Sequence, residues 1–319
     1  MEPILEIQHL KKFFNSPAGL LHAVDDVSFS MKEGTTLGVV GESGCGKSTL
    51  GRTILHLLDS TDGKIFFQGE DITHVKRRKL KQLRQDMQII FQDPFSSLNP
   101  RMTVSDIISE AFYINGSKNK RHVRSETRKL MDTVGLAKIF EYSYPHELDG
   151  GRCQRIGIAR ALALNPKFIV CDEPVSALDV SIQAQILNLL SDLQKEKKLT
   201  YIFVTHDLSV VRYISDSIVV MYLGQMAEKA SSDELFKEPL HPYTKALLSA
   251  IPVPDVHHIK NRILLQGEIS SPINPAPGCR FAVRCNYASE KCKSPQVLEE
   301  VRQNHFVFCC KVREINNGN

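Results

Sequence analysis

The stretch that decides the fold lies near the amino terminus and reads Gly41-Glu42-Ser43-Gly44-Cys45-Gly46-Lys47-Ser48-Thr49. It matches the pattern Gly-x-x-x-x-Gly-Lys-Ser/Thr, and its surroundings predict a buried strand over Thr35–Val40 and a helix over Thr49–Leu58. Glycine lets the backbone curl round a phosphate, so that successive N–H groups and the helix amino terminus face the anion. Lys47 would place its charge on the β- and γ-phosphates, and Ser48 would give its hydroxyl to Mg²⁺. A plain Gly-rich turn is the alternative, but the flanking strand and helix favour a nucleotide-phosphate site.

Composition and charge set the class of protein. The chain has 319 residues, 42% of them hydrophobic and 24% charged, which is typical of a large globular domain with a smaller appendage. The formal net charge of +4 is too mild to indicate a nucleic-acid partner, and the basic run 76–81 fits a solvated helix face better than a phosphate-binding patch. We see neither a secretory signal nor a run of roughly eighteen apolar residues, and therefore expect a soluble, cytoplasmic chain.

Two later strands end in polar residues. The apolar run from Phe168 ends in Asp172 and Glu173, which would place Asp172 beside the Mg²⁺ on Ser48 and let Glu173 accept a proton from an attacking water. A solvated acidic turn is the alternative. Residues 201–206 repeat the layout and end in His206, which could donate a hydrogen bond to a γ-phosphate, although a lone histidine is more often structural.

Two weaker signals lie on either side of the phosphate loop. Phe13 and Phe14 fall at the predicted end of a strand over Ile4–His9; they are either core aromatics or, for Phe14, a platform that stacks on adenine. Gln92 follows a predicted buried strand over Met87–Phe91, where ligands of open α/β sheets bind, so its amide could reach the nucleotide's metal. Taken alone, Gln92 would more often be a turn residue.

The order of elements predicts an α/β protein with a mostly parallel sheet, because strands alternate with helices. Residues 100–147 show helical periods without a convincing strand and predict a helical insertion. A hairpin is expected around Gly224, followed by a short helix over Ser231–Phe236. The proline-rich segment Ile251–Pro277 is expected to be a linker at a domain boundary.

The segment Leu148-Asp149-Gly150-Gly151-Arg152-Cys153-Gln154-Arg155 makes the set of motifs resemble a family. It is similar to the signature Leu-Ser-Gly-Gly-Gln of the ATP-binding subunits of ABC transporters, over roughly residues 1–250. The segment from Phe91 to Met102, the run His241-Pro242-Tyr243-Thr244-Lys245 and a cysteine-rich tail resemble the oligopeptide/dipeptide/nickel importer branch. This resemblance implies a P-loop ABC cassette over 1–250, with an antiparallel β subdomain and a helical subdomain near 100–150, and a small extension over 251–319.

The resemblance also implies a function and partners. Members of the family hydrolyse ATP to drive import of short peptides, as one half of a heterodimer with a second ATPase subunit. They lie on the cytoplasmic face of the membrane beneath two membrane-spanning permeases, which an extracytoplasmic peptide-binding protein supplies. A soluble ABC ATPase acting on nucleic acid or ribosomes, or an importer of nickel or another small solute, is the alternative. The motifs favour the peptide importer, with no nucleic-acid partner.

Site roles follow from the same resemblance. Each ATP would lie between the phosphate loop of one subunit and the signature of the other. The backbone of 41–49 would hold the phosphates, Ser48, Gln92 and Asp172 would surround Mg²⁺, Glu173 would be the general base and His206 the γ-phosphate sensor. The residues facing the partner's ATP would be Asp149, Gly150 and Gly151.

One departure from the family pattern concerns the signature. Asp149 stands where the family has serine, and Arg152 where it has glutamine. A carboxylate beside a γ-phosphate is repelled in a poorly solvated site, although Arg152 could neutralise it. We therefore expect an asymmetric pair, in which the site completed by Asp149 binds ATP but turns over slowly. A tolerated variant is the alternative.

The tail concentrates cysteine. Of eight cysteines, the last five lie within 41 residues, and four of these, Cys279, Cys285, Cys292 and Cys309, are six, seven and seventeen residues apart. In a reducing compartment such a group favours metal over disulfides, and the spacing lacks the Cys-x₂-Cys of zinc fingers. A 4Fe–4S cluster, which some members of the branch carry, is the leading prediction for these four; zinc and free thiols stay open, and Cys310 is expected to be spare.

Overall fold

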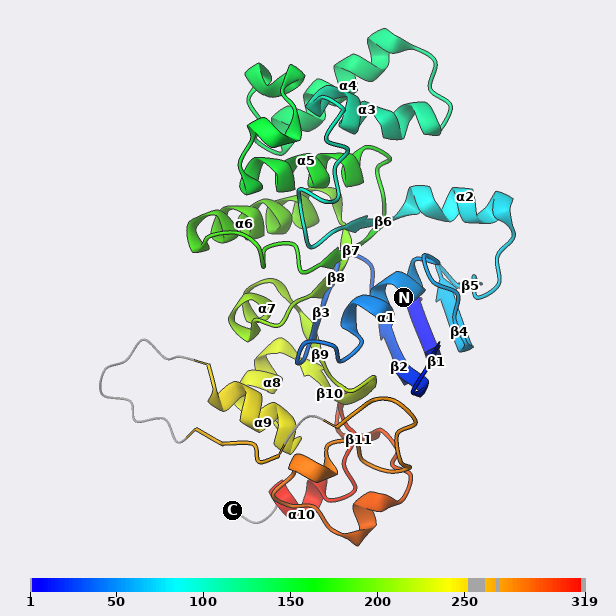
Figure 1. Ribbon diagram of the computed structural model, residues 1–319, viewed down its shortest axis with the longest axis vertical. Coiled ribbons are helices and arrows are strands. Elements are labelled where there is room, and N and C mark those ends of the chain that lie inside the picture. The colour runs from blue at the N-terminus through cyan, green and yellow to red at the C-terminus, as the bar shows by residue number, and fades with distance from the viewer. Residues whose placement is uncertain (1, 252–261, 268–269, 317–319) are drawn as a thin grey trace. The chain divides into compact units, whose positions relative to one another are not determined.

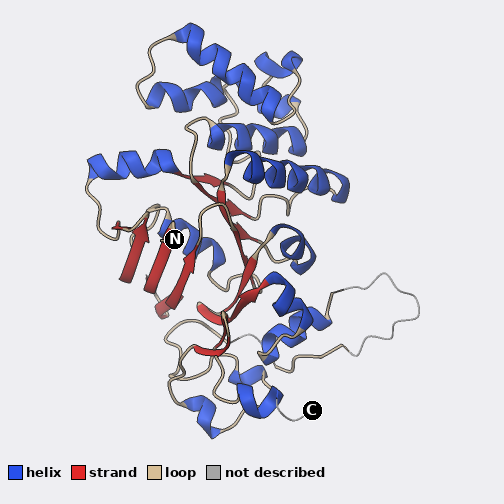
Figure 2. Cartoon of the chain, turned by 180° about the vertical axis from the view of Figure 1, so that it is seen from behind, coloured by secondary structure: helices blue, strands red, loops and turns tan. Residues whose placement is uncertain are grey.

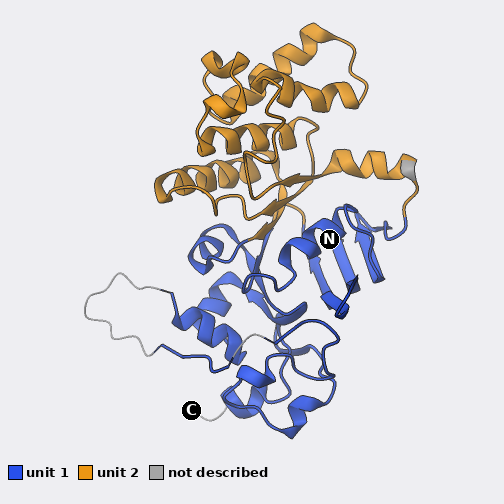
Figure 3. Ribbon diagram, in the orientation of Figure 1, with its two compact units in different colours: residues 1–32, 36–74, 205–319 blue, residues 33–35, 75–204 orange. Residues whose placement is uncertain are grey.

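The computed structural model describes residues 2–251, 262–267 and 270–316 (Figure 1). Its chain divides into two compact units: residues 1–32, 36–74 and 205–319 form the first, and residues 33–35 and 75–204 the second (Figure 3). Part of the predicted linker, 252–261 and 268–269, falls outside the described residues, so the boundary at 251 stays a prediction. None of the helices within the described ranges is long and apolar enough to cross a bilayer.

An antiparallel sheet occupies one part of the first unit. Its strands are β1 (Leu5–Ser16), β2 (Gly19–Met31), β4 (Asp62–Phe67) and β5 (Glu70–Asp71), in the order β2-β1-β4-β5. Alternate apolar side chains of β1 and β2 are buried, as the period of two predicts. β1 is longer than predicted and runs to Ser16, because its register with β2 continues to Gly19. Phe13 and Phe14 therefore lie within a strand and not at its end.

A mixed sheet forms the other part of the first unit. β3 (Thr36–Val40) pairs in parallel with β9 (Ser217–Tyr222), which forms the predicted hairpin with β10 (Gln225–Ser231). Two strands of the tail, β12 (His305–Val307) and β11 (Glu299–Arg302), extend this sheet beyond β10 in antiparallel pairing. The tail is thus hydrogen-bonded to the same sheet that contains β3, the strand that leads into the phosphate loop.

The helices of the first unit are short. They are α1 (Lys47–Ile54), α7 (Leu208–Ile214), α8 (Ser232–Lys237), α9 (Pro242–Ser249) and α10 (Val312–Asn316). The helix predicted over Ser231–Phe236 is present as α8, and Ser231 caps it through the N–H of Glu234. The helix predicted over Thr49–Leu58 is wrong at its end: it stops at Ile54, and His56 follows with a left-handed φ of 52°.

The second unit combines a parallel sheet with helices (Figure 2). β6 (Met87–Ile90), β7 (Phe168–Asp172) and β8 (Thr200–Val204) pair in parallel in the order β8-β7-β6. β7 and β8 are buried along their full length, as strands covered on both faces require. The helices are α2 (Arg77–Asp86), α3 (Val104–Ile114), α4 (Lys120–Thr133), α5 (Gly150–Leu162) and α6 (Val180–Lys197), with 3₁₀ turns at Lys138–Tyr142 and Pro145–Glu147. Between 100 and 147 every regular element is helical, which confirms the predicted insertion.

Candidate nucleotide-binding site

The phosphate loop, residues 41–49, connects β3 to α1 in the first unit. Gly46 has a φ of 103°, and a Cβ at this position would come 1.9 Å from the carbonyl oxygen of Ala23 on β2. The carbonyl of the neighbouring Cys45 accepts a 2.8 Å hydrogen bond from the N–H of Gly224. The loop therefore packs against the backbone of β2 and of the turn at Gly224, and glycine is required where β2 approaches.

Lys47 is buried within this loop, with 4% of its surface exposed. Its Nζ donates to the carbonyls of Gly41 at 2.9 Å and Glu42 at 3.0 Å, and lies 3.9 Å from the Cys45 sulfur. The ammonium group is thus held inside the curve of the loop. A bound phosphate would replace these neutral carbonyl acceptors by an anionic one, with which the ammonium group interacts more strongly.

His206 is placed beside the start of the phosphate loop by the backbone. The N–H of the preceding Thr205 donates to the carbonyl of Val39 at 3.1 Å, two residues before Gly41. The following Asp207 caps α7 by accepting from two of its N–H groups. His206 is therefore fixed between a strand end and a helix start. Its predicted contact with a γ-phosphate stays a prediction.

The two aromatic residues of β1 have different surroundings. Phe13 stacks on His22 with ring centroids 4.0 Å apart, whereas Lys12 places its ammonium group 4.8 Å from the centre of the Phe14 ring. Phe14 is half-buried. Adjacent strand residues point to opposite faces, so Phe13 lies with His22 on one face of the sheet and Phe14 lies on the other face. Adenine stacking by Phe14 stays a prediction.

The predicted catalytic acids lie in the second unit, at the carboxyl end of β7. Asp172 is the last residue of the strand and is 1% exposed. Glu173 follows with a left-handed φ of 48°, its N–H bonded to the carbonyl of Val204 at 2.9 Å, and its Oε2 accepts from the Nε2 of Gln92 at 3.0 Å. A non-glycine residue in this conformation is held there by its surroundings. The fold therefore brings Gln92 and Glu173 together.

Asp149 begins α5. Its side chain accepts from the N–H of Arg152 at 2.8 Å and forms an ion pair with the Arg152 guanidinium, whose carbon lies 4.7 Å from the centre of the Phe140 ring. A carboxylate at a helix amino terminus is stabilised by the helix dipole as well as by the arginine. Gly150 and Gly151 form the first turn behind it, so the charge of Asp149 is balanced within the signature itself.

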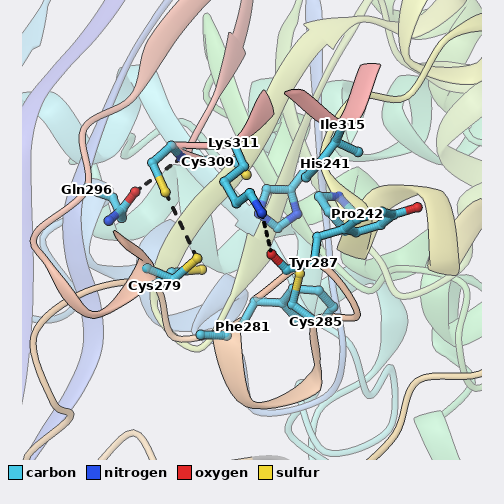
Figure 4. A pocket seen from close by; sticks show the side chains of 13 residues that line it. His241, Pro242, Cys279, Phe281, Cys285, Tyr287, Gln296, Cys309, Lys311 and Ile315 are labelled. Carbon is cyan, nitrogen blue, oxygen red and sulfur yellow. Dashed lines mark hydrogen bonds between the residues drawn. The ribbon is translucent and has the colours of Figure 1, made fainter. Parts of the chain in front are cut away.

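A pocket in the tail brings the cysteines together (Figure 4). The four predicted ligands line it with Cys310, and the sulfurs of Cys292 and Cys310 are 4.0 Å apart. Burial raises the pKa of Cys279 to about 12 and that of Cys309 to about 11, so both thiols stay protonated at neutral pH unless a metal binds. In the described part of the chain, no group of three or more His, Cys, Asp or Glu is arranged to hold a metal ion. The sulfurs of the predicted cluster thus share one pocket without being arranged as a metal site, and the cluster stays a prediction.

Sequence reasoning missed three residues that contact the phosphate loop or its support. Tyr243 accepts a hydrogen bond from the N–H of Glu42, Arg284 pairs with the Glu42 carboxylate, and Arg280 pairs with Asp25. Tyr243 and Arg284 lie in segments that carried the family resemblance, but nothing in those segments indicated what they contact.

Comparisons with known proteins agree with this geometry. Residues 24–176 match the ABC transporter family, and residues 227–292 match the C-terminal region of oligopeptide/dipeptide transporters. The oligopeptide transport ATP-binding protein AppF of Bacillus subtilis is 52% identical over 97% of either chain. Its counterpart OppF of Escherichia coli is 50% identical, over 96% of this chain and 93% of the relative.

Solved structures show the same fold. The dimeric ATP-binding cassette MJ0796, bound to ADP and Pi in a post-hydrolysis state, matches with a TM-score of 0.66 at 27% identity and covers 72% of this chain and 98% of its own. The cassette cbiO1 from Clostridium perfringens, part of the ABC transporter complex cbiONQ, matches with a TM-score of 0.67 at 28% identity, over 75% and 92%. The predicted cassette fold is confirmed.

Proposed function

We propose that this chain, which belongs to the ATP-binding subunits of ABC transporters and to their oligopeptide importer branch, hydrolyses ATP to power the uptake of short peptides. Identity near 50% over almost the whole length of named oligopeptide transport subunits carries this conclusion. The phosphate loop, whose conformation requires glycine at position 46 and which contains the buried Lys47, supplies the nucleotide site that such an activity needs. The chain is therefore an ATPase, and peptides are the proposed cargo.

The residues of each unit have separate tasks in this proposal. In the first unit, the 41–49 backbone and Lys47 would bind the phosphates, and Ser48 would be a ligand of Mg²⁺. In the second, Asp172 would be a ligand of Mg²⁺ and Glu173 would accept the proton from the attacking water. Mg²⁺, when bound, would neutralise charge on the β- and γ-phosphates. The Gln92 amide donates to Glu173 from Nε2, which orients the base, and its oxygen would be the atom that holds Mg²⁺.

The activity is tested with Glu173→Gln, which keeps the size of the side chain but removes the base. We expect Mg-ATP binding to be retained and hydrolysis to fall about 10²- to 10⁴-fold, the usual contribution of a general base. Glu126→Gln, at a half-buried position of α4, is the matched control and should hydrolyse like the wild type. Wild-type turnover in Glu173→Gln would remove Glu173 from the mechanism.

The partners follow from the same branch. We place the chain at the cytoplasmic face of the membrane, beneath two permease subunits and paired with a second ATPase subunit, with a peptide-binding protein outside. The charged signature supports pairing with a different subunit. In a homodimer both ATP sites would contain Asp149 and Arg152, which depart from the family pattern. Size exclusion of Glu173→Gln with Mg-ATP, alone and with a candidate partner, tests this. A stable homodimer would refute the heterodimer and the slow site assigned to Asp149.

The tail is proposed to hold a 4Fe–4S cluster on Cys279, Cys285, Cys292 and Cys309. The support is that all four thiols line one pocket, which a tetrathiolate centre requires. When bound, the cluster would order the tail. Iron and acid-labile sulfide are measured in anaerobically purified protein, with Cys310→Ser as the variant that should keep both. Protein with zinc instead, or with neither, would overturn the assignment.

A further inference from the structure

The tail contacts the phosphate loop directly through Arg284. Its guanidinium Nη1 donates to both carboxylate oxygens of Glu42, at 2.8 and 3.1 Å, and the side chains are 10% and 24% exposed. Glu42 is the second residue of the phosphate loop, and its carbonyl also accepts from Lys47. The tail therefore neutralises a carboxylate that the loop itself carries.

Tyr243 holds the same residue by its backbone. Its hydroxyl oxygen accepts from the N–H of Glu42 at 3.0 Å, and the side chain is fully buried. Burial raises the pKa of Tyr243, so the phenol keeps its proton. The ring packs at 5.4 Å, centre to centre, from that of Phe281 in the tail and at 4.8 Å from Tyr222. The position of the hydroxyl is thus fixed by aromatic packing that the tail completes.

A second contact supports the middle of the loop. Arg280 donates to the carbonyl of Leu223 and pairs with Asp25, and its side chain is 6% exposed. The next residue, Gly224, donates its N–H to the carbonyl of Cys45. Arg280 therefore stabilises the turn at Leu223 and Gly224, which contacts the middle of the phosphate loop. Arg284 and Tyr243 contact the beginning of the same loop.

We propose that Arg284 and Tyr243 are positioning residues of the nucleotide site, through which the tail sets the affinity of the phosphate loop for ATP. The inference rests on the proposed function in one respect, that residues 41–49 bind a nucleotide. Arg284 acts in two ways: it fixes Glu42, and it cancels a negative charge near the polyphosphate. Loss of the arginine would leave that carboxylate unpaired, and the repulsion would be greater for ATP than for the less charged ADP.

The charge is tested in the full chain with Arg284→Gln, Glu42→Gln and the double variant. We expect Arg284→Gln to raise the Kd for Mg-ATP about three- to tenfold, with a smaller rise for ADP, in line with loss of one charged hydrogen-bonded pair. Adding Glu42→Gln should restore most of the affinity, because no carboxylate is then left unpaired. Arg302→Gln is the matched control: Arg302 also joins the tail to the cassette by pairing with a glutamate, Glu238, and within the described residues it forms no hydrogen bond or ion pair with the loop.

The hydrogen bond is tested with Tyr243→Phe, which removes one oxygen from a buried ring. We expect the Kd for Mg-ATP to rise about threefold or more. Tyr201→Phe is its control, because the buried Tyr201 hydroxyl has no hydrogen-bond partner within the described residues. A residue with only a structural role would lower the unfolding midpoint and leave the Kd of the folded protein unchanged.

The outcomes separate the two proposals. If the wild type does not bind Mg-ATP, or if Lys47→Ala binds as well as the wild type, the nucleotide site itself is wrong. If the wild type binds and Lys47→Ala does not, but Arg284→Gln and Tyr243→Phe bind like their controls, the positioning role is refuted. An equal loss in Arg284→Gln and in the double variant would refute the charge argument and leave the geometric one to Tyr243→Phe, whose Kd then decides it.

Discussion

Replacement of Gly46 by alanine should destabilise the protein far more than the same change at Gly44, two residues earlier. At Gly46 the φ of 103° is left-handed, and the new Cβ would come 1.9 Å from the Ala23 carbonyl oxygen. Because this distance is far shorter than a van der Waals contact, strand β2 or the loop must shift to accommodate the new Cβ. At Gly44 the φ is 76° and no atom lies within 4 Å of the new Cβ, so backbone strain is the main penalty.

The magnitude follows from these two geometries. Strain in a left-handed conformation costs about 1–2 kcal/mol for alanine, and this applies to both variants. At Gly46, movement of β2 also threatens the bonds that join Asp25 to Gly224 and Gly224 to Cys45, each 2.8 Å long. With about 1 kcal/mol net for each bond, Gly46→Ala should lose about 2 kcal/mol more than Gly44→Ala.

Urea unfolding of the nucleotide-free chain measures the difference, because no ligand then contributes to stability. The midpoint of Gly46→Ala should lie clearly below that of Gly44→Ala, with similar slopes. Equal midpoints would mean that β2 yields at little cost, and that the close approach of β2 is not what requires glycine at this position.

Two further predictions concern buried carboxylates. Glu228 is fully buried, accepts from two backbone N–H groups and pairs with an imidazole nitrogen, at 2.7 to 2.9 Å. Glu228→Ala should therefore lower the free energy of unfolding, measured by urea titration, by about 3 kcal/mol. Glu196 is exposed, and Glu196→Ala should unfold like the wild type. Burial of Glu141 opposes its negative charge, but hydrogen bonds from Arg128 and Arg124 outweigh this effect and lower the pKa of the carboxyl group. The ionised Glu141 therefore stabilises the fold above the ordinary carboxyl pKa, and this stabilisation is lost as the pH falls below that value. Between about pH 6 and pH 3.5 the wild type should therefore lose more stability than Glu141→Gln, and equal losses would contradict this assignment.

The sequence by itself determined the elements that depend on local pattern. A glycine-rich run between an apolar strand and a helix specifies a phosphate loop, because positive φ and clustered N–H groups are properties of adjacent residues. Continuous apolar runs specified β7 and β8 in the same way, and the polar residues that follow them were found where the strands end. Helix ends were less certain, as the early stop of α1 shows, since the chain turns there through the left-handed His56.

The tertiary structure alone decided what holds the phosphate loop. Glu42 is 201 residues from Tyr243 and 242 from Arg284, and no periodicity connects positions so far apart. Arg284 reaches the loop because the tail pairs with β10 and continues the sheet that contains β3, whereas Tyr243 lies on α9, which packs against β10. The same packing gathers the tail's cysteines into one pocket, and spacing along the chain could not fix the distances between their sulfurs. Local chemistry follows from neighbouring residues, whereas support between distant residues depends on how the whole unit packs.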